Sequence, residues 1–316
     1  MTELKNILIS GGTGFIGEHL SKLLRDRNIN IKITSRKNHN GIIFDSEKNS
    51  FPKEELEGVD TVFHLIGYTH DLSNDKKNKD KYLDINLKLT IEIVNLAHEC
   101  EVKNFIFLSS TKAIGINNKK LEINEYEQSV PNDMYGKSKR EAELYLLKFK
   151  KRTNMNISIV RSPLVYGENL KGNLYNLIRW VKNKKFPPLN IKNKRSMIHV
   201  SDLCKAMVLI SEQKNLNSNL FLVTDNHEYS TTDIINSIKF ALNYKKSFFY
   251  FPTFLLLILA FCGEIINLVT KFPFDKNRYN KLVNNEYYSS NEIKKLGFKP
   301  EFSFYSSIND MLKYIK

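Results

Sequence analysis

The sequence predicts an α/β fold, a doubly wound parallel sheet with a smaller, mostly helical C-terminal domain. Apolar runs of strand length alternate with helical patterns from residue 4 to about residue 225, and a glycine-rich loop joins the first strand to the first helix. Beyond residue 225 the chain reads as helices and loops. We therefore assign 1–167 and about 196–225 to the sheet domain, and about 168–195 and 226–316 to the second domain.

The composition is that of an ordinary globular chain with an excess of basic residues. Of the 316 residues, 41% are hydrophobic and 26% are charged, and the formal net charge is +14. Such a charge suits a nucleic acid, an anionic membrane surface or an anionic substrate. The lysines are scattered and no nucleic-acid-binding motif is present, so we favour a compositional bias and expect no nucleic-acid partner.

The cysteines and the N-terminal residues indicate the cellular compartment in which the protein is expected. Cys100, Cys204 and Cys262 are far apart and form no CxxC pair, as expected for reduced thiols in a cytoplasmic protein. They predict neither a disulfide framework nor a metal site. The first residues, MTELKN, lead directly into a strand pattern, so no signal peptide is expected.

The first strand, at 4–10, is followed by GGTGFIG at 11–17 and then by a helical pattern. Strand, glycine loop and helix in this order are the context of a dinucleotide-binding loop, in which backbone N–H groups and the positive helix end hold a pyrophosphate. The expected cofactor contacts in this loop are Gly11, Gly14, Phe15, Ile16 and Gly17.

The second strand, at 29–34, is followed by Ser35, Arg36 and Lys37. An acidic residue here would bind the adenosine ribose of NAD, whereas a guanidinium suits the 2′-phosphate of NADP. An exposed basic loop explains these residues equally well in so lysine-rich a chain. The prediction is NAD(P), leaning to NADP(H), with Asp45, after the apolar run at 41–44, as a candidate contact to the adenine.

Two further strands are predicted before the next motif. The strand at 59–67 carries Leu65 and Gly67 as expected cofactor contacts, and His64 as a structural residue rather than a catalyst. A polar loop at 69–81 and a helix around 81–99 with Asn86 come next. The strand at 102–110 ends in Ser109, Ser110 and Thr111, at the sheet edge where ligands of parallel sheets bind.

Tyr135 and Lys139 are four positions apart, so on a helix they share one face. A phenol titrates near ~10, too high for a proton carrier at neutral pH, and a nearby ammonium group lowers that pKa. Tyr135 is therefore a candidate general acid or base. The same spacing is common on solvated helix surfaces. Only the surrounding strands, helices and glycine loop favour the interpretation of Tyr135 and Lys139 as a catalytic pair.

The rest of the chain continues the pattern and then departs from it. A strand at 156–160, RSPLVYG at 161–167, a helix around 173–183 and a strand–helix pair in RSMIHVSDLCKAMVLI precede a last sheet strand at 221–225. The most apolar stretch, 251–263, has an unbroken core about half the ~20 residues that span a bilayer. It predicts a buried or interfacial helix without a transmembrane span, which leaves room for a weak membrane-surface contact.

With these motifs, the chain resembles the extended short-chain dehydrogenase/reductase family, the NAD(P)-dependent epimerases and dehydratases of nucleotide sugars. The resemblance runs nearly end to end, through GGTGFIG, HLIG, LSSTKAIG, YGKSK, RSPLVYG and RSMIHVSD. It is strongest for a branch of bacterial polysaccharide (O-antigen-type) biosynthesis that contains UDP-sugar 4-epimerases and UDP-4-keto-6-deoxy-N-acetylhexosamine 4-reductases. The resemblance implies a Rossmann fold, a UDP-sugar substrate and a cytoplasmic location, and it is compatible with a homodimer.

The resemblance also implies roles for single residues. Ser110 matches the hydroxyl that binds the sugar's 4-oxygen, Tyr135 the proton carrier, and Lys139 the residue that binds the nicotinamide ribose. Substrate contacts to the UDP are expected from Asn173 and Arg195, and from Arg278 in place of a missing RxGD motif. Two positions depart from the family: Ser162 replaces a proline, and Thr111-Lys112 replaces the Asp-Glu pair of 4,6-dehydratases.

These departures reduce the number of reactions that the enzyme is expected to catalyse. Without the Asp-Glu pair a 4,6-dehydratase is disfavoured, and no Cys and His follow Ser110 as a 3,5-epimerase would need. Hydride chemistry at carbon 4 remains. The basic residues at 35–37 favour a UDP-4-keto-6-deoxy-N-acetylhexosamine 4-reductase. The alternative is a UDP-glucose or UDP-N-acetylglucosamine 4-epimerase with tightly bound NAD, and a remote one is a non-enzymatic redox-sensing regulator.

Overall fold

The computed structural model describes residues 4–36, 41–46, 50–69, 76–115, 122–127, 129–184, 186–214, 216–245, 249–267, 270, 272 and 274–315. Lys37, which the sequence groups with Ser35 and Arg36, lies outside these residues, as do residues 70–75 of the loop expected at 69–81.

A seven-stranded parallel sheet forms the centre of the molecule and confirms the predicted fold class. Its order is β3-β2-β1-β4-β5-β6-β9, with every pairing parallel. The chain therefore moves outward on one side from β1 and on the other side from β4, which places a topological switch point between them. The strands are β1 (Asn6–Ser10), β2 (Asn30–Ser35), β3 (Ile42–Ile43), β4 (Thr61–His64), β5 (Asn104–Ser110), β6 (Asn156–Ser162) and β9 (Leu220–Leu222).

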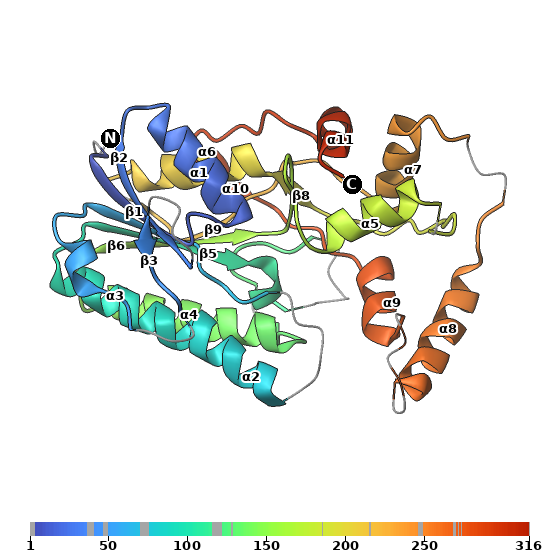
Figure 1. Cartoon of the computed structure of the whole chain (residues 1–316), viewed down its shortest axis with the longest axis horizontal. Coiled ribbons are helices and arrows are strands. Elements are labelled where there is room, and N and C mark those ends of the chain that lie inside the picture. The colour runs from blue at the N-terminus through green and yellow to red at the C-terminus, as the bar shows by residue number, and fades with distance from the viewer. Residues whose placement is uncertain are drawn as a thin grey trace.

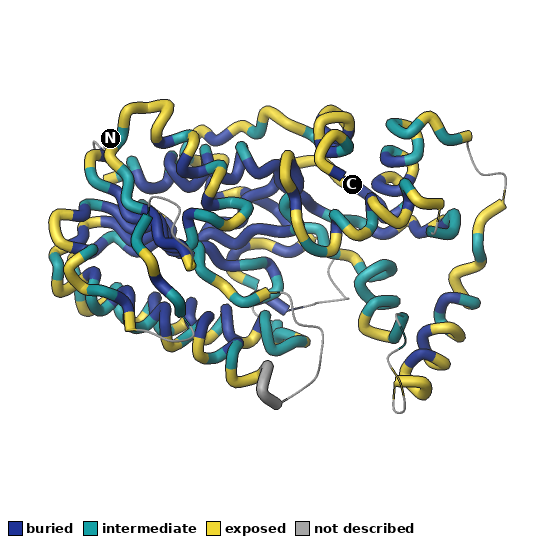
Figure 2. The backbone as a smooth tube through the Cα atoms, viewed as in Figure 1, coloured by how far each residue is buried: buried dark blue, intermediate teal, exposed yellow. Residues whose placement is uncertain are grey.

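Helices cover both faces of this sheet (Figure 1). α1 (Phe15–Arg25) and α6 (Val200–Ser211) pack on one face, and α3 (Leu89–Glu99) and α4 (Met134–Lys150) on the other. Because both faces are covered, strands such as β4 are buried along their whole length. Figure 2 shows the buried strands as a dark blue layer between partly exposed helices.

The helix expected around 81–99 begins earlier than predicted. α2 (Lys76–Leu83) runs into a π-helical segment, η2 (Asp84–Lys88), and then into α3. The charged stretch KKNKDK at its start carries no apolar periodicity, so no helix was predicted there. The π segment holds Asn86 in a buried position, and π-bulges are frequent at functional sites.

Two short strands and several helices lie outside the main sheet. β7 (Leu164–Tyr166) and β8 (Met197–His199) pair in a small parallel sheet of their own, so RSPLVYG contributes only its first residues to the main sheet. The remaining elements are η1 (Lys53–Leu56), η3 (Thr111–Ala113), α5 (Asn173–Lys182), α7 (Thr231–Ala241), α8 (Thr253–Ile266), α9 (Lys276–Val283), α10 (Asn291–Lys295) and α11 (Phe304–Lys313).

α5, α7 and α11 share one apolar core, which Leu256 of α8 and the apolar residues of α9 also contact. α8 and α9 pack on each other and project from the molecule (Figure 1). Gly263 permits this packing, because an added Cβ would lie 1.8 Å from the carbonyl oxygen of Phe274. Cys100, Cys204 and Cys262 are free thiols.

Candidate active site

The glycine loop has the close packing that a dinucleotide site needs. Gly11 has a φ of 80°, in the left-handed region that favours glycine. A Cβ at Gly17 would lie 2.3 Å from the carbonyl oxygen of Gly11, so only a glycine lets α1 start so close to the loop. Phe15 and Ile16 open the helix, whose first N–H groups have no partners within it. The loop therefore fits a pyrophosphate.

The end of β2 lies beside this loop. The backbone N–H of Gly11 donates to Thr34 Oγ1 at 2.9 Å, and Thr13 Oγ1 donates to Ser35 Oγ at 3.5 Å. Arg36, the next residue, is exposed. Its side chain is thus free to reach solvent or a ligand next to the loop, while Asp45 is half-buried after β3.

Ser110, Tyr135 and Lys139 meet at the carboxyl end of β5. Ser110 ends that strand and Tyr135 lies in the first turn of α4, where Asp133 accepts a hydrogen bond from the N–H of Gly136 at 2.7 Å. Ser110 bonds to the phenol of Tyr135. Lys139 is buried one helical turn farther on. The predicted trio is therefore assembled in space.

Its electrostatics differ from the expectation that Lys139 lowers the pKa of Tyr135. Burial raises the pKa of Tyr135 to about 12, only partly opposed by the hydrogen bond with Ser110. Burial also lowers the pKa of Lys139 to about 8. The ammonium donates to the carbonyl oxygen of Leu108 at 3.0 Å and lies 4.5 Å from the centre of the Phe107 ring. The ammonium group of Lys139 is thus directed at β5, where its charge makes both of these contacts.

Asn86 connects the trio to the neighbouring strand, and the sequence alone did not assign it this role. Its side-chain amide donates to Ser138 Oγ at 2.9 Å and exchanges two hydrogen bonds with the backbone of Tyr68. Ser138 in turn donates to the carbonyl oxygen of Tyr135 at 2.8 Å. A Cβ at Gly67 would lie 3.2 Å from Lys139 Nζ, which places the end of the β4 segment against the same group.

A buried ion pair supports α4 from below the site, and sequence reasoning missed it. Glu143 and Arg161 are each about 1% exposed and form two hydrogen bonds, at 2.9 and 2.6 Å. Glu143 also accepts from Ser109 Oγ at 2.6 Å. The pair ties the helix of Tyr135 to β5 and β6. Its members are separated along the chain, so no local motif could reveal it.

His64 has the structural role expected for it. Its two ring nitrogens are bonded to Ser10 Oγ at 2.6 Å and Thr90 Oγ1 at 3.0 Å. Burial, with a smaller contribution from the charge of Lys139, lowers the pKa of His64 to about 3. The imidazole is therefore neutral at physiological pH and holds β1, β4 and α3 together.

A cleft of about 310 Å³ lies beside the trio, with a buried carboxylate in its wall. Lys112, Asp133, Lys281 and Glu286 are among its lining residues. Glu286 is bound to Lys112 and, at 3.3 Å, to Arg195. Burial alone would raise the pKa of Glu286, but Lys112, Arg195 and Lys281 together hold it below its ordinary value. The sequence did not predict this carboxylate.

The three predicted substrate contacts have different surroundings. Arg195 is 14% exposed and, besides Glu286, donates to the carbonyl oxygen of Lys281 at 2.6 Å. Arg278 lies in the first turn of α9 and pairs with Asp275 at 3.9 Å. Asn173 is the exposed first residue of α5. Of these, only Arg195 belongs to the cluster around Glu286.

Comparison with known proteins agrees with this arrangement. Residues 7–223 match the NAD-dependent epimerase/dehydratase family. The UDP-glucose 4-epimerase of Vibrio cholerae is 31% identical over 252 residues, 76% of each chain. The N-acetyl-alpha-D-glucosaminyl-diphospho-ditrans,octacis-undecaprenol 4-epimerase of Escherichia coli O157:H7 is 24% identical over 98% of this chain and 95% of its own.

Solved structures share the fold over the whole chain. The UDP-N-acetylglucosamine 4-epimerase of Methanobrevibacter ruminantium M1 superposes with a TM-score of 0.76 at 20% identity, covering 99% of this chain and 98% of that one. The UDP-glucose 4-epimerase of Thermotoga maritima gives 0.75 at 20% identity, with 98% of both chains covered. With the fold, the site geometry and the family match in agreement, this chain belongs to the NAD-dependent epimerase/dehydratase family, a group of enzymes within the extended short-chain dehydrogenases/reductases.

Proposed function

We propose that the protein interconverts the carbon-4 epimers of a hexose or N-acetylhexosamine that is joined to its carrier through a diphosphate. The Escherichia coli relative carries this proposal, because it matches 98% of the chain, including the C-terminal helices, and is named a 4-epimerase. The Vibrio cholerae relative, a UDP-glucose 4-epimerase, supports the same reaction. We therefore propose an epimerase rather than the reductase, which the basic residues at 35–37 favoured.

In this reaction Ser110 holds the 4-oxygen and Tyr135 moves its proton. With a pKa of about 12, the phenol is protonated at neutral pH and can donate when a 4-keto sugar is reduced. Oxidation of the sugar at carbon 4 needs the phenolate form of Tyr135 as the base. Bound ligands must therefore bring positive charge toward Tyr135 and lower its pKa, with Lys139 one helical turn away. When bound, the dinucleotide supplies the acceptor and donor of the hydride at carbon 4.

The cations around Glu286 are proposed to hold the diphosphate. Arg195 and Lys112 are both paired with this carboxylate, and a diphosphate offers the same kind of partner with more charge. We assign Arg195 and Lys112 to the phosphates. Asn173 and Arg278 remain predicted contacts to the carrier.

The same cluster speaks against a 4,6-dehydratase, although enzymes of that name are among the relatives. Elimination of water needs a carboxylic acid beside the sugar. Lys112 and Arg195 keep Glu286 ionised, and Asp133 accepts the N–H of Gly136 as a helix cap. Glu286 is therefore not set to donate a proton.

The direct test is conversion without added cofactor. Purified protein is incubated with UDP-glucose or UDP-N-acetylglucosamine, and the galacto isomers are measured by NMR. Conversion without added NADH or NADPH is expected, because an epimerase regenerates its bound dinucleotide in every turnover. Failure to epimerise any diphosphate-linked hexose would contradict the proposal.

The 4-reductase is a second candidate, favoured by Arg36 at the end of β2. Arg36 is exposed next to the glycine loop, where a 2′-phosphate would lie. NADPH consumption in stoichiometric amounts with a UDP-4-keto-6-deoxyhexosamine, without epimerisation of UDP-sugars, would establish the reductase instead. Extraction of the bound dinucleotide from the purified protein separates NAD from NADP.

A further inference from the structure

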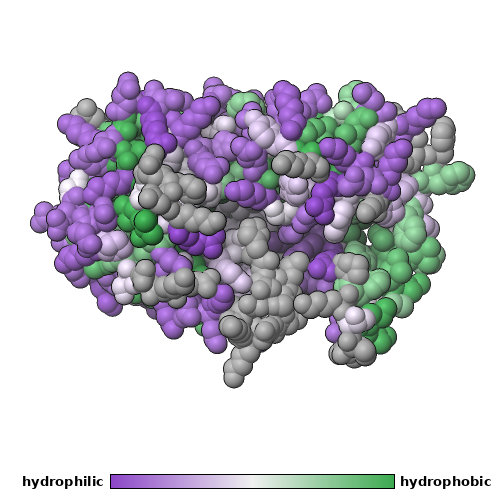
Figure 3. All heavy atoms as spheres, viewed as in Figure 1, coloured by the Kyte–Doolittle hydropathy of each residue, from purple (hydrophilic) through white to green (hydrophobic). Residues whose placement is uncertain are grey.

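α8 has an apolar surface that the described part of the chain leaves uncovered. One face buries Leu256, Ala260 and Gly263. On the rest of the helix, large apolar residues are exposed: Phe254 (62%), Ile258 (52%), Phe261 (48%) and Ile265 (68%). Their spacing of three and four residues makes them one stripe, and Figure 3 shows apolar side chains gathered over α8. A helix that is apolar all round normally lies in a core or against a membrane.

The length of α8 decides between crossing a bilayer and lying on it. Its 14 residues extend about 21 Å, less than the ~30 Å hydrocarbon layer. Within the described ranges, no helix is long and apolar enough to cross a membrane. A short apolar helix with an exposed stripe is suited to the interface of a bilayer, where its stripe is buried among lipids.

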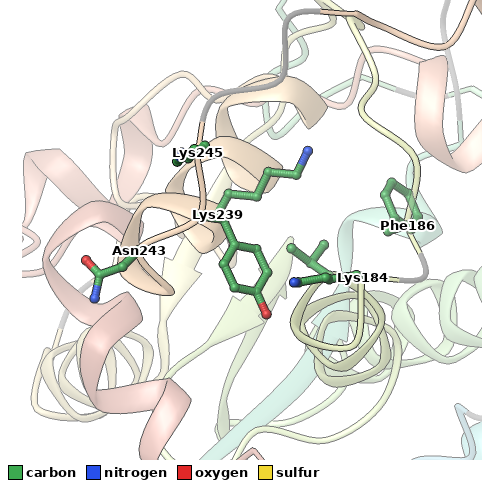
Figure 4. A pocket seen from close by; sticks show the side chains of 7 residues that line it. Lys184, Phe186, Lys239, Asn243 and Lys245 are labelled. Atoms are coloured by element: carbon green, nitrogen blue, oxygen red, sulfur yellow. The ribbon is translucent and has the colours of Figure 1, made fainter.

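One basic side chain contacts this stripe, and others line a pocket on the helices before α8 in the chain. Lys184, Lys239 and Lys245 line a pocket of about 450 Å³ between α5 and α7 (Figure 4). The segment leading to α8 is tied to the pocket's edge, since the N–H of Phe251 donates to the carbonyl oxygen of Pro188 at 2.7 Å. Lys276 of α9 contacts the stripe itself, because its Nζ lies 5.3 Å from the centre of the Phe261 ring.

This charge pattern favours an anionic lipid surface as the occupant. Lysines beside a membrane-buried stripe attract anionic headgroups. A second copy of the chain would cover the same stripe, but two copies would each bring Lys276 to that contact, in chains that each carry a net charge of +14. Like charges placed opposite each other disfavour that pairing.

α8 also borders the candidate active site. Glu264 of α8 and Lys276 of α9 line the same cleft as Lys112 and Glu286. A surface on which α8 rests therefore lies next to the cleft proposed to take the sugar diphosphate. A sugar whose diphosphate is attached to a lipid would enter from that surface without leaving the bilayer.

We propose that α8 docks the protein on an anionic bilayer and that the sugar in the neighbouring cleft is carried on a lipid diphosphate. The substrate half of this inference rests on the proposed 4-epimerase function, whereas the docking half rests on the exposed stripe of α8 and on Lys276 beside it. The substrate class is a sugar joined through a diphosphate to a membrane lipid.

Docking is tested by sedimentation of the full chain with vesicles of phosphatidylglycerol and phosphatidylcholine, or of phosphatidylcholine alone. The wild type is expected to bind the anionic vesicles, less strongly as salt is added. Ile258→Glu and, separately, Ile265→Glu are expected to weaken binding by roughly tenfold or more, because each places a charge in the apolar stripe. Leu144→Glu, at a 38% exposed position on α4, is the matched control and should bind as the wild type does.

The substrate is tested with N-acetylglucosamine diphosphopolyprenol in the anionic vesicles and UDP-N-acetylglucosamine in solution. Ile258→Glu should slow epimerisation of the lipid-carried sugar and leave that of the UDP-sugar, if any, unchanged. Equal effects on both would overturn the substrate half. A folded wild type that ignores vesicles, with a dimer that Ile258→Glu dissociates, would overturn docking in favour of a second copy. Vesicle binding without turnover of either sugar would uphold docking and refute the proposed reaction.

Discussion

Burial shifts the titration of Tyr135 and Lys139 in opposite directions. It raises the pKa of the phenol to about 12 and lowers the pKa of the ammonium group to about 8. Each shift disfavours the charged form of its group. The chain by itself therefore keeps a protonated phenol in the site, and the ligands must supply the positive charge that makes it a base.

Replacing Tyr135 by Phe removes the proton and keeps the ring. The turnover number of Tyr135→Phe should fall by roughly 10²–10⁴, the usual contribution of general acid–base catalysis, while the Kd for UDP stays close to that of the wild type. Steady-state kinetics and calorimetry measure the two quantities. Tyr145→Phe, on the same helix, is the control. A Phe variant with near-normal turnover would reduce Tyr135 to a packed aromatic.

His64 makes the stability of the fold depend on pH. Its pKa is about 3 in the folded chain and about 6.5 when unfolded, so between these values the unfolded chain binds the extra proton. The free energy of unfolding should therefore fall as the pH drops from about 6.5 toward 3, by up to ~1.4 kcal/mol per pH unit from this group. Urea unfolding of wild type and His64→Asn at pH 7 and 4.5 measures the difference. The variant should show a shallower loss, and His98→Asn, an exposed position on α3, should not.

Glu286 joins elements that are far apart in the sequence. Lys112 comes from η3, Arg195 precedes β8, and Glu286 follows α9. The carboxylate thus neutralises the cations that we assign to the diphosphate. In the free protein this contact holds the segment after α9 against the sheet domain, and in the complex the phosphates compete with it.

Glu286→Gln should separate these two effects. The free energy of unfolding of the unliganded variant should fall by about 1–3 kcal/mol, because Lys112 and Arg195 lose a partner for their partly buried charges. UDP should then stabilise the variant more than the wild type, since the carboxylate of Glu286 no longer competes for Arg195. Thermal unfolding with and without UDP measures both. Glu228→Gln, which breaks an exposed pair with Lys194, should change neither. A smaller UDP effect in Glu286→Gln would mean that the carboxylate itself contacts the ligand.

The elements that the sequence predicted well are those defined by local chemistry. The glycine loop, β1 and α1 follow from one continuous stretch, and the Tyr135–Lys139 spacing already implied a shared helix face. α2 and the π-helical segment around Asn86 could not be predicted from charged residues without periodicity. A strand was predicted where β8 lies, whereas β7 was not separated from the strand before it, and the pairing of β7 with β8 depends on tertiary packing.

At the scale of the whole molecule, the alternation of strands and helices was enough to predict the fold class. The residues of the candidate site could be predicted from the sequence only in part. Gly11 and Ser110 lie at the same edge of the sheet because the carboxyl ends of parallel strands share it, and Tyr135 reaches Ser110 from the first turn of α4. Glu286, and the Glu143–Arg161 pair, depend on contacts between distant segments that no single motif records. Arg195 was predicted as a phosphate ligand without its carboxylate partner.

This sharing of one sheet edge makes dinucleotide binding a property of the whole fold. A ligand that binds only the folded chain, at about 100 times its Kd, raises the free energy of unfolding by about 2.7 kcal/mol. Both NAD and NADP should show such an effect in thermal unfolding. Arg36→Ala should reduce the effect of NADP and leave that of NAD unchanged, because the guanidinium can pair only with the 2′-phosphate. Loss of that charge-assisted bond, worth about 1.5–3 kcal/mol, corresponds to a tenfold or greater rise in the Kd for NADP. Arg25→Ala, at the end of α1, is the control. Equal weakening of both dinucleotides by Arg36→Ala would assign Arg36 to the pyrophosphate or to the loop itself, and the case for a reductase would lose its support.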